Sequence, residues 1–184
     1  MVLAALSRLL PHPHNFTPLV GMALFAMAYM PKAWQAIALT MLSYLLSDAL
    51  VNAFLHPEAS AWSYFVSPTA LGVYTGMLLV SGIGFALKSK PIKLSRLMVG
   101  SVSGSLVFYL ASNTAVWLGS GFYAKSFTGW LTALYAGIPF YQANDVLSSF
   151  FLNQILGDLF FTGLLFGAYA LVNNGSLKPA RIGS

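Results

Sequence analysis

The chain has 184 residues, of which 58% are hydrophobic and 7% are charged, with a net charge of +5. A soluble domain carries about 25% charged residues, so this composition excludes a soluble protein and predicts an integral membrane protein. The absence of cysteine excludes thiol catalysis, iron–sulfur clusters and thiolate zinc sites. The cations are too few and too scattered to indicate binding to nucleic acid.

The N-terminal part contains one doubtful and one clear membrane element. Residues 1–10 are apolar but too short to cross a bilayer alone, and they include Arg8. A Pro-His-Pro-His-Asn run at residues 11–15 ends them. The next helix is expected at residues 18–30, where a Thr-Pro pair can cap and begin it. Because this stretch is short for a span, we expect it to tilt or to pack inside a bundle.

Longer apolar runs predict further spans, at residues 32–54, 68–88, 92–118 and 150–172. Residues 123–149 are also apolar, but glycine and proline interrupt them and aromatic residues, which prefer the membrane boundary, are frequent. We interpret them as an interfacial or re-entrant segment before the last helix. The expected fold is an all-α membrane protein, a single domain over residues 1–184 with five to six transmembrane helices.

The distribution of lysine and arginine predicts the orientation. If the spans alternate in direction, one side holds only Lys125 and Arg8. The other side collects Lys32, Lys88, Lys90, Lys93, Arg96, Lys178 and Arg181. Because cytoplasmic loops carry an excess of cations, we expect this second side and the C-terminus to be cytoplasmic. The loops around residues 11–16, 55–67 and 119–149 then face outward.

Glycines recur at four-residue spacing within the predicted spans. The pairs are Gly72 with Gly76, Gly100 with Gly104, and Gly163 with Gly167. Small residues let membrane helices approach closely, and close packing is what holds such helices together. We therefore predict that these glycines lie at helix contacts within the bundle. The alternative is that one such face docks a partner protein.

Strongly polar residues within the spans are biased to the half that should face outward. They are Gln154 and the five candidate binding residues Asp48, Asn52, Asn113, Asn153 and Asp158. Polar groups in hydrocarbon are costly, which makes them candidates for a binding site. We predict that the five candidates converge from three helices to bind a ligand. The alternative is that they only satisfy one another.

Outer loops supply further candidate ligand contacts. His12 and His14 would lie above the pocket, and an aromatic side chain such as Trp62 or Tyr141 would close over the ligand. The alternative role of these aromatic residues is an interfacial belt. Metal sites usually need three or four convergent ligands, so we predict no metal at these histidines.

Four sequence features together resemble a known group of proteins. They are the run Arg8–Pro18, the Leu-Ser-Asp sequence ending at Asp48, Tyr135–Phe140 and Leu156–Phe160. The chain resembles a family of small, uncharacterised bacterial membrane proteins that is similar to the S components of energy-coupling-factor transporters. The resemblance implies six helices with both termini cytoplasmic, and binding of a vitamin or similar micronutrient from outside. It also implies transport with a shared membrane coupling protein and two ATPases.

The sequence therefore predicts a substrate-binding protein of the S-component type in the bacterial inner membrane. The expected partners are the lipid bilayer, a small-molecule ligand and other membrane subunits. No phosphate-binding loop of the Walker type is present, and neither enzymatic activity nor a cofactor is predicted. The alternative is a non-catalytic structural or accessory subunit of a larger photosynthetic or respiratory membrane complex.

Overall fold

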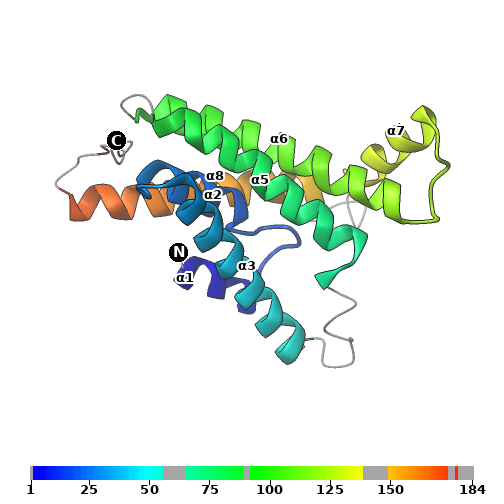
Figure 1. Cartoon of the computed structure of the whole chain (residues 1–184), viewed down its shortest axis with the longest axis horizontal. Helices are drawn as coiled ribbons and strands as arrows, with labels where there is room; N and C mark the ends of the chain where they lie inside the picture. Colours follow the sequence, from blue (N-terminus) through cyan, green and yellow to red (C-terminus); the bar gives the residue numbers. More distant parts are fainter. Residues whose placement is uncertain (1, 56–64, 89–91, 139–148, 174–176, 178–184) are drawn as a thin grey trace.

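The computed structural model describes residues 2–55, 65–88, 92–138, 149–173 and 177. Within these ranges the secondary structure is helical and contains no strand (Figure 1). The helices are α1 (Val2–Leu6), the 3₁₀ helix η1 (Ser7–Leu9), α2 (Leu19–Tyr29), α3 (Ala33–Leu55), α5 (Pro68–Lys88), α6 (Leu94–Gly119), α7 (Phe127–Ala136) and α8 (Phe150–Val172). The ends of α2, α3, α5, α6 and α8 agree with the predicted spans to within a residue or two.

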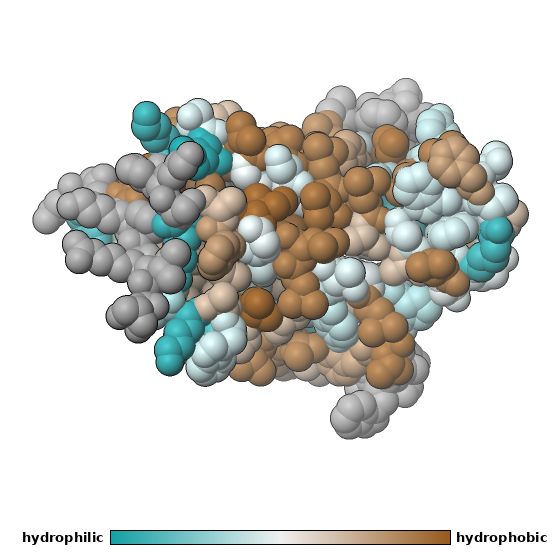
Figure 2. Space-filling model, turned by 45° about the horizontal axis from the view of Figure 1, so that its top comes forward, coloured by the Kyte–Doolittle hydropathy of each residue, from teal (hydrophilic) through white to brown (hydrophobic). Residues whose placement is uncertain are grey.

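The long helices form a membrane bundle. Among the described residues, α3, α5, α6 and α8 are each long and apolar enough to cross a membrane. Figure 2 shows a hydrophobic band across the middle of one face, between two ends where hydrophilic residues gather. The predicted fold class, an all-α membrane protein, is confirmed.

The short helix α2 lies inside this bundle. It has 11 residues, which at 1.5 Å per residue makes it about 16 Å long. The hydrocarbon core of a bilayer is about 30 Å thick. α2 packs against α3, α5, α6 and α8, and Met22, Leu24 and Ala28 have 0% exposure. A helix that is apolar on every side suits such a buried position, so the expectation that this stretch packs inside the bundle is confirmed.

Three of the predicted packing glycines lie at close helix crossings. A Cβ added at Gly72 in α5 would lie 2.6 Å from Cβ of Ala115 in α6. One at Gly104 in α6 would lie 2.7 Å from Cγ1 of Val20 in α2. Gly76 is similar, because a Cβ there would lie 2.9 Å from an α6 side chain. The absence of a side chain is what allows these helices to meet, as predicted.

The other three predicted packing glycines behave differently. Gly100 is buried, but a Cβ there would meet Leu87 at an ordinary contact distance of 3.7 Å. Gly163 and Gly167 are exposed, and no described residue lies within 4 Å of a Cβ placed at either. The prediction that this last pair packs within the bundle is wrong. α8 turns its opposite face, which includes the buried Phe161, toward α2.

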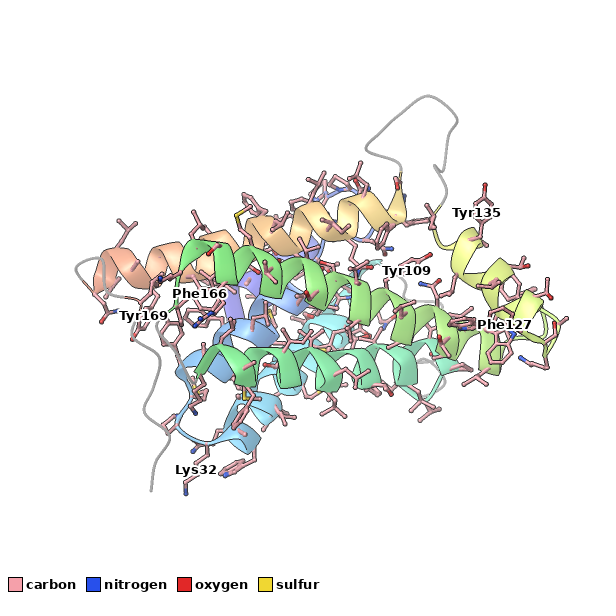
Figure 3. The ribbon with its side chains drawn as sticks, turned by 90° about the horizontal axis from the view of Figure 1, so that it is seen from above. Lys32, Tyr109, Phe127, Tyr135, Phe166 and Tyr169 are labelled. Atoms are coloured by element: carbon pink, nitrogen blue, oxygen red, sulfur yellow. The ribbon has the colours of Figure 1, made fainter. Side chains whose placement is uncertain are left out.

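The two ends of the bundle differ in charge. One end, called here the cation-rich end, carries Lys32, Lys88, Lys93 and Arg96, and the other, the α7 end, carries α7 (Figures 1 and 3). Lys88 Nζ donates to the backbone oxygens of Met30 at 2.6 Å and Pro31 at 2.8 Å. This ammonium group holds the end of α5 against the α2–α3 turn, where it also stabilises the negative end of the α2 dipole.

The N-terminal segment, residues 2–18, lies along the bundle instead of crossing it. α1 and η1 pack against α3, and Ala4 and Ala5 are buried. A turn follows, in which the backbone N–H of Phe16 donates to the oxygen of Pro13 at 3.1 Å. Asn15 has a φ of 61°, a left-handed conformation that asparagine tolerates better than most residues. The turn directs the chain back into the bundle at α2.

α7 is a short helix beside the end of α6. The indole nitrogen of Trp130 in α7 donates to Oγ1 of Thr114 in α6 at 2.9 Å. Lys125, just before α7, donates to backbone oxygens at the C-terminal end of α6. A short helix instead of a span fits the expectation for residues 123–149. Residues 139–148 of that segment lie outside the described part of the chain.

Candidate functional site

A cavity of about 420 Å³ lies toward the α7 end, between the N-terminal segment, α3, α5, α6, α7 and α8. Its aromatic lining residues are Tyr44, Phe108, Tyr109, Tyr123 and Phe150. Its polar lining residues are Arg8, Asn15, Thr17, Thr69, Ser112, Asn113 and Gln154. Ligand sites usually enclose about 300–1,000 Å³ and hold a few polar groups, so this cavity is the candidate site for a small molecule.

A second hollow, of about 690 Å³, lies between α5 and α6. Its lining is almost entirely apolar and includes the exposed side chains of Leu71, Leu79, Leu110 and Leu118. In a membrane bundle such a groove faces the hydrocarbon of the lipids. It lacks the polar groups that would orient a small polar ligand, so we assign the site to the first cavity.

Arg8 is the one charged residue in the described lining of the cavity. Its Nη2 donates to Oδ1 of Asp48 at 2.8 Å, and its Nη1 donates to Oγ of Ser47, also at 2.8 Å. The guanidinium carbon lies 5.2 Å from the centre of the Tyr44 ring, within the range of a cation–π contact. Asp48 is 1% exposed, and no described residue donates to its second oxygen, Oδ2. The ion pair thus joins the N-terminal segment to α3 and places the guanidinium at the cavity.

A second buried carboxylate, Asp158 of α8, lies against α6 and the start of α2. Ser105 Oγ donates to Asp158 Oδ2 at 2.6 Å. A further donor is the backbone N–H of Val20, one of the first-turn N–H groups that a helix leaves unsatisfied. Gln154 Nε2 donates to the backbone oxygen of Ser105 at 2.7 Å. Because Gln154 lines the cavity, this cluster connects the cavity wall to the centre of the bundle.

The wall formed by α6 and α7 is held by side chains of α6. The hydroxyl of Tyr109 donates to the backbone oxygen of Leu134 in α7. Asn113 Nδ2 donates to the backbone oxygen of Tyr109 at 2.9 Å. A Cβ at Gly137, just after α7, would collide with both side chains. Figure 3 shows Tyr109 in the space between α6, α7 and α8, so this tyrosine fixes where α7 closes the cavity.

The five predicted polar residues do not converge on one pocket. Asn113 lines the cavity, whereas Asp48, Asn52, Asn153 and Asp158 are buried outside the lining. Asn52 Nδ2 donates to the backbone oxygen of Asp48 at 3.0 Å within α3. Asp158 lies one helical turn beyond Gln154, the second of the two α8 residues in the lining, and Arg8 joins Asp48 to the cavity. Of the five, Asn113 alone is a described lining residue, and ligand binding by any of them stays a prediction.

The two predicted histidine contacts are not among the described lining residues. His12 and His14 are exposed, and the His14 ring lies edge-on to the Phe150 ring, with centres 5.7 Å apart. Trp62 and Tyr141 lie outside the described residues. Within the described ranges no group of three or more His, Asp and Glu residues could hold a metal ion.

Sequence reasoning missed the polar face of α6. Ser105 and Tyr109 make the contacts described above, and Ser101 Oγ accepts a hydrogen bond from Thr162 Oγ1 of α8 at 3.3 Å. With Asn113, these residues recur every fourth position, which places them on one side of a helix. This four-residue spacing alone indicates a polar face on the helix. Serine and tyrosine carry no charge, so each is a weaker sign of a buried site than an aspartate.

Comparisons with known proteins give one family. Neither a search of curated proteins nor a search of solved structures found a match. The sequence matches a family of unknown function, DUF6580, over residues 1–180. The match includes every described helix and all the described residues of the cavity. The chain therefore belongs to this family, DUF6580.

Proposed function

We propose that the protein is a substrate-binding membrane protein of the S-component type that serves the uptake of a small micronutrient. The observation that carries this proposal is the cavity of about 420 Å³, which combines aromatic rings, side-chain amides and one guanidinium within a membrane bundle. Buried polar groups in a membrane are costly and are usually retained for function. The resemblance of the sequence to a family similar to S components supports the same role.

We further propose that the cation-rich end faces the cytoplasm of a bacterium, with the C-terminus on that side. Lys32, Lys88, Lys93 and Arg96 lie at that end, while Lys125 lies at the α7 end. An excess of lysine and arginine marks the cytoplasmic side of inner-membrane proteins. The cavity then lies in the outer half of the protein, on the side from which a nutrient arrives.

Single cysteines test this orientation, because the native chain contains none. Ser95 and Thr128 are both exposed and lie at the cation-rich end and the α7 end. In intact spheroplasts, a membrane-impermeant maleimide should label Thr128→Cys at once and Ser95→Cys only after lysis. Equal labelling of both variants before lysis, or the reverse order, would contradict the proposed orientation.

Ligand binding is tested by native mass spectrometry of protein extracted gently from its own membrane. We expect a small molecule to remain bound to the native chain and to be lost from Ala136→Trp, because Ala136 lines the cavity. Leu131→Trp is the matched control, since Leu131 is exposed on the same helix and does not line the cavity. Copurifying ATPase subunits would support coupling to transport. A native chain that carries no small molecule would count against this function.

The exposed glycine face of α8 favours a second candidate, an accessory subunit of a larger membrane complex. Gly163 and Gly167 have open space around them, beside the exposed Phe160 and Leu164. Gly163→Leu should then release a partner without lowering thermal stability in detergent. Gly104→Leu is the matched comparison and should lower stability by about 1–3 kcal/mol through overpacking. If Gly163→Leu leaves the size of the extracted complex unchanged, the accessory role loses its support.

A further inference from the structure

We propose that the cavity binds a small, planar carboxylic acid, with its carboxylate on Arg8. This inference rests on the proposed function and adds the chemical class of the ligand. The described lining holds one formal charge, the Arg8 guanidinium, and no acidic side chain. A cation would therefore meet only an unfavourable charge in the lining, whereas an anion would meet a favourable one.

Arg8 has hydrogen-bond donors to spare. A guanidinium carries five N–H donors, and the described partners of Arg8 use two of them, one for Asp48 and one for Ser47. Its side chain is 13% exposed, and it lines the cavity. The remaining donors can reach a carboxylate, whose two oxygens match the planar fork of a guanidinium.

The carboxylate of Asp48 limits how strongly an anion can bind. Asp48 already neutralises Arg8, so an added anion must share the guanidinium with it. The bound ligand and Asp48 would repel each other, which favours a single negative charge on the ligand over the two charges that a phosphate monoester carries near neutral pH. A carboxylate meets this condition.

The rest of the lining indicates the body of the ligand. Five aromatic side chains face the cavity, and aromatic pairs favour stacked or edge-on contacts with a flat ring. Asn113 and Gln154 both commit an amide N–H to a backbone oxygen. Their amide oxygens accept no bond from a described residue and are available to N–H or O–H groups of a ligand. A small aromatic acid with a polar ring substituent fits these features.

Benzoate and benzamide form a probe pair that tests the charge requirement. They share one flat ring and differ in whether the substituent is a carboxylate or a neutral amide. In nanodiscs of phosphatidylcholine, ligand-induced changes in tyrosine and tryptophan fluorescence should show that the native chain binds benzoate about tenfold more tightly than benzamide. The double variant Arg8→Gln with Asp48→Asn removes both charges together, and it should bind the two probes equally.

A variant that keeps both charges controls for loss of binding through misfolding. Arg8→Lys retains a cation beside Asp48 but loses the planar fork, so its preference for benzoate should fall without vanishing. Equal binding of the two probes by the native chain, or an unchanged preference in the double variant, overturns the carboxylate assignment. Binding of neither probe also overturns it. In each case the proposed uptake function is judged separately, by whether native mass spectrometry finds a molecule in the cavity.

Discussion

The two buried carboxylates of the bundle are satisfied in different ways. Asp48 has a cationic partner, Arg8, which is supplied by the short N-terminal segment packed beside α3. Asp158 receives its described hydrogen bonds from neutral donors, the Ser105 hydroxyl and the Val20 N–H, which belong to the central helices α6 and α2. One carboxylate holds a peripheral segment next to the cavity, and the other holds the core.

The two contacts should differ in how readily they rearrange. The Arg8–Asp48 contact depends on charge and joins α3 to a segment of two very short helices. The Asp158 contacts join bundle helices that also meet through close backbone packing, whereas the N-terminal segment meets the backbone of α8 at Phe16 and Thr17, beyond its two short helices. A Cβ at Gly21 in α2 would lie 2.9 Å from the backbone nitrogen of Thr162 in α8. We therefore expect the periphery, and not the core, to respond when a ligand enters.

The largest predicted effect is that of Arg8→Met. Methionine keeps much of the side-chain length but leaves Asp48 buried without its cation. Removing one partner of a buried ion pair costs about 3–5 kcal/mol, so the melting temperature in detergent should fall markedly.

The double variant Arg8→Met with Asp48→Asn serves as the control for this prediction. Replacing both partners by neutral groups removes the unpaired charge, and it should restore most of the lost stability. If the double variant is as unstable as Arg8→Met alone, the ion pair is not the reason for the loss, and the contrast between the two carboxylates fails.

A smaller effect is predicted for Ser105→Ala. Alanine removes the hydroxyl that donates to Asp158 at 2.6 Å but adds no volume. Leaving a buried acceptor without its donor costs about 1–3 kcal/mol. Ser112→Ala is the matched control, because among the described residues its hydroxyl bonds only to a backbone oxygen of its own helix, at 3.2 Å. Thermal melting should show a clear loss for the first variant and little change for the second.

The sequence is sufficient to predict where the helices begin and end. It is insufficient to predict which of their residues line the cavity. Proline, glycine and charge mark the ends of apolar runs, so α5 and α8 were placed at their observed bounds. Depth in the membrane also follows from counting residues along a helix. Which side of a helix faces the cavity does not, because it depends on how each helix rotates against its neighbours. Asp48 and Asp158 are accordingly buried outside the described lining of the cavity, Asp48 against Arg8 and Asp158 against Ser105.

The glycine pairs show the same limit. Gly72 with Gly76 and Gly163 with Gly167 have identical spacing, yet the first pair packs against α6 and the second faces outward. A four-residue spacing indicates only that two residues share a face of a helix. Whether a neighbouring helix covers that face is decided by the three-dimensional arrangement. In α8 the bulky Phe161 and Phe166 supply the buried face, and the glycines remain on the side away from the core.

The smallest predicted effect is that of Asp158→Asn. Asparagine has the same shape, and its amide oxygen can still accept the hydrogen bond of Ser105. The described surroundings of Asp158 hold no cation, so the substitution leaves no unpaired positive charge behind. The single amide oxygen must then accept from both Ser105 and the Val20 N–H, at a cost of about 1 kcal/mol. Asp48→Asn is the direct comparison, since it deprives Arg8 of its anion and should lower the melting temperature more. Melting curves of the two proteins in the same detergent decide the matter. Equal losses would mean that both carboxylates depend on a charged partner, and a larger loss for Asp158→Asn would reverse the assignment of core and periphery.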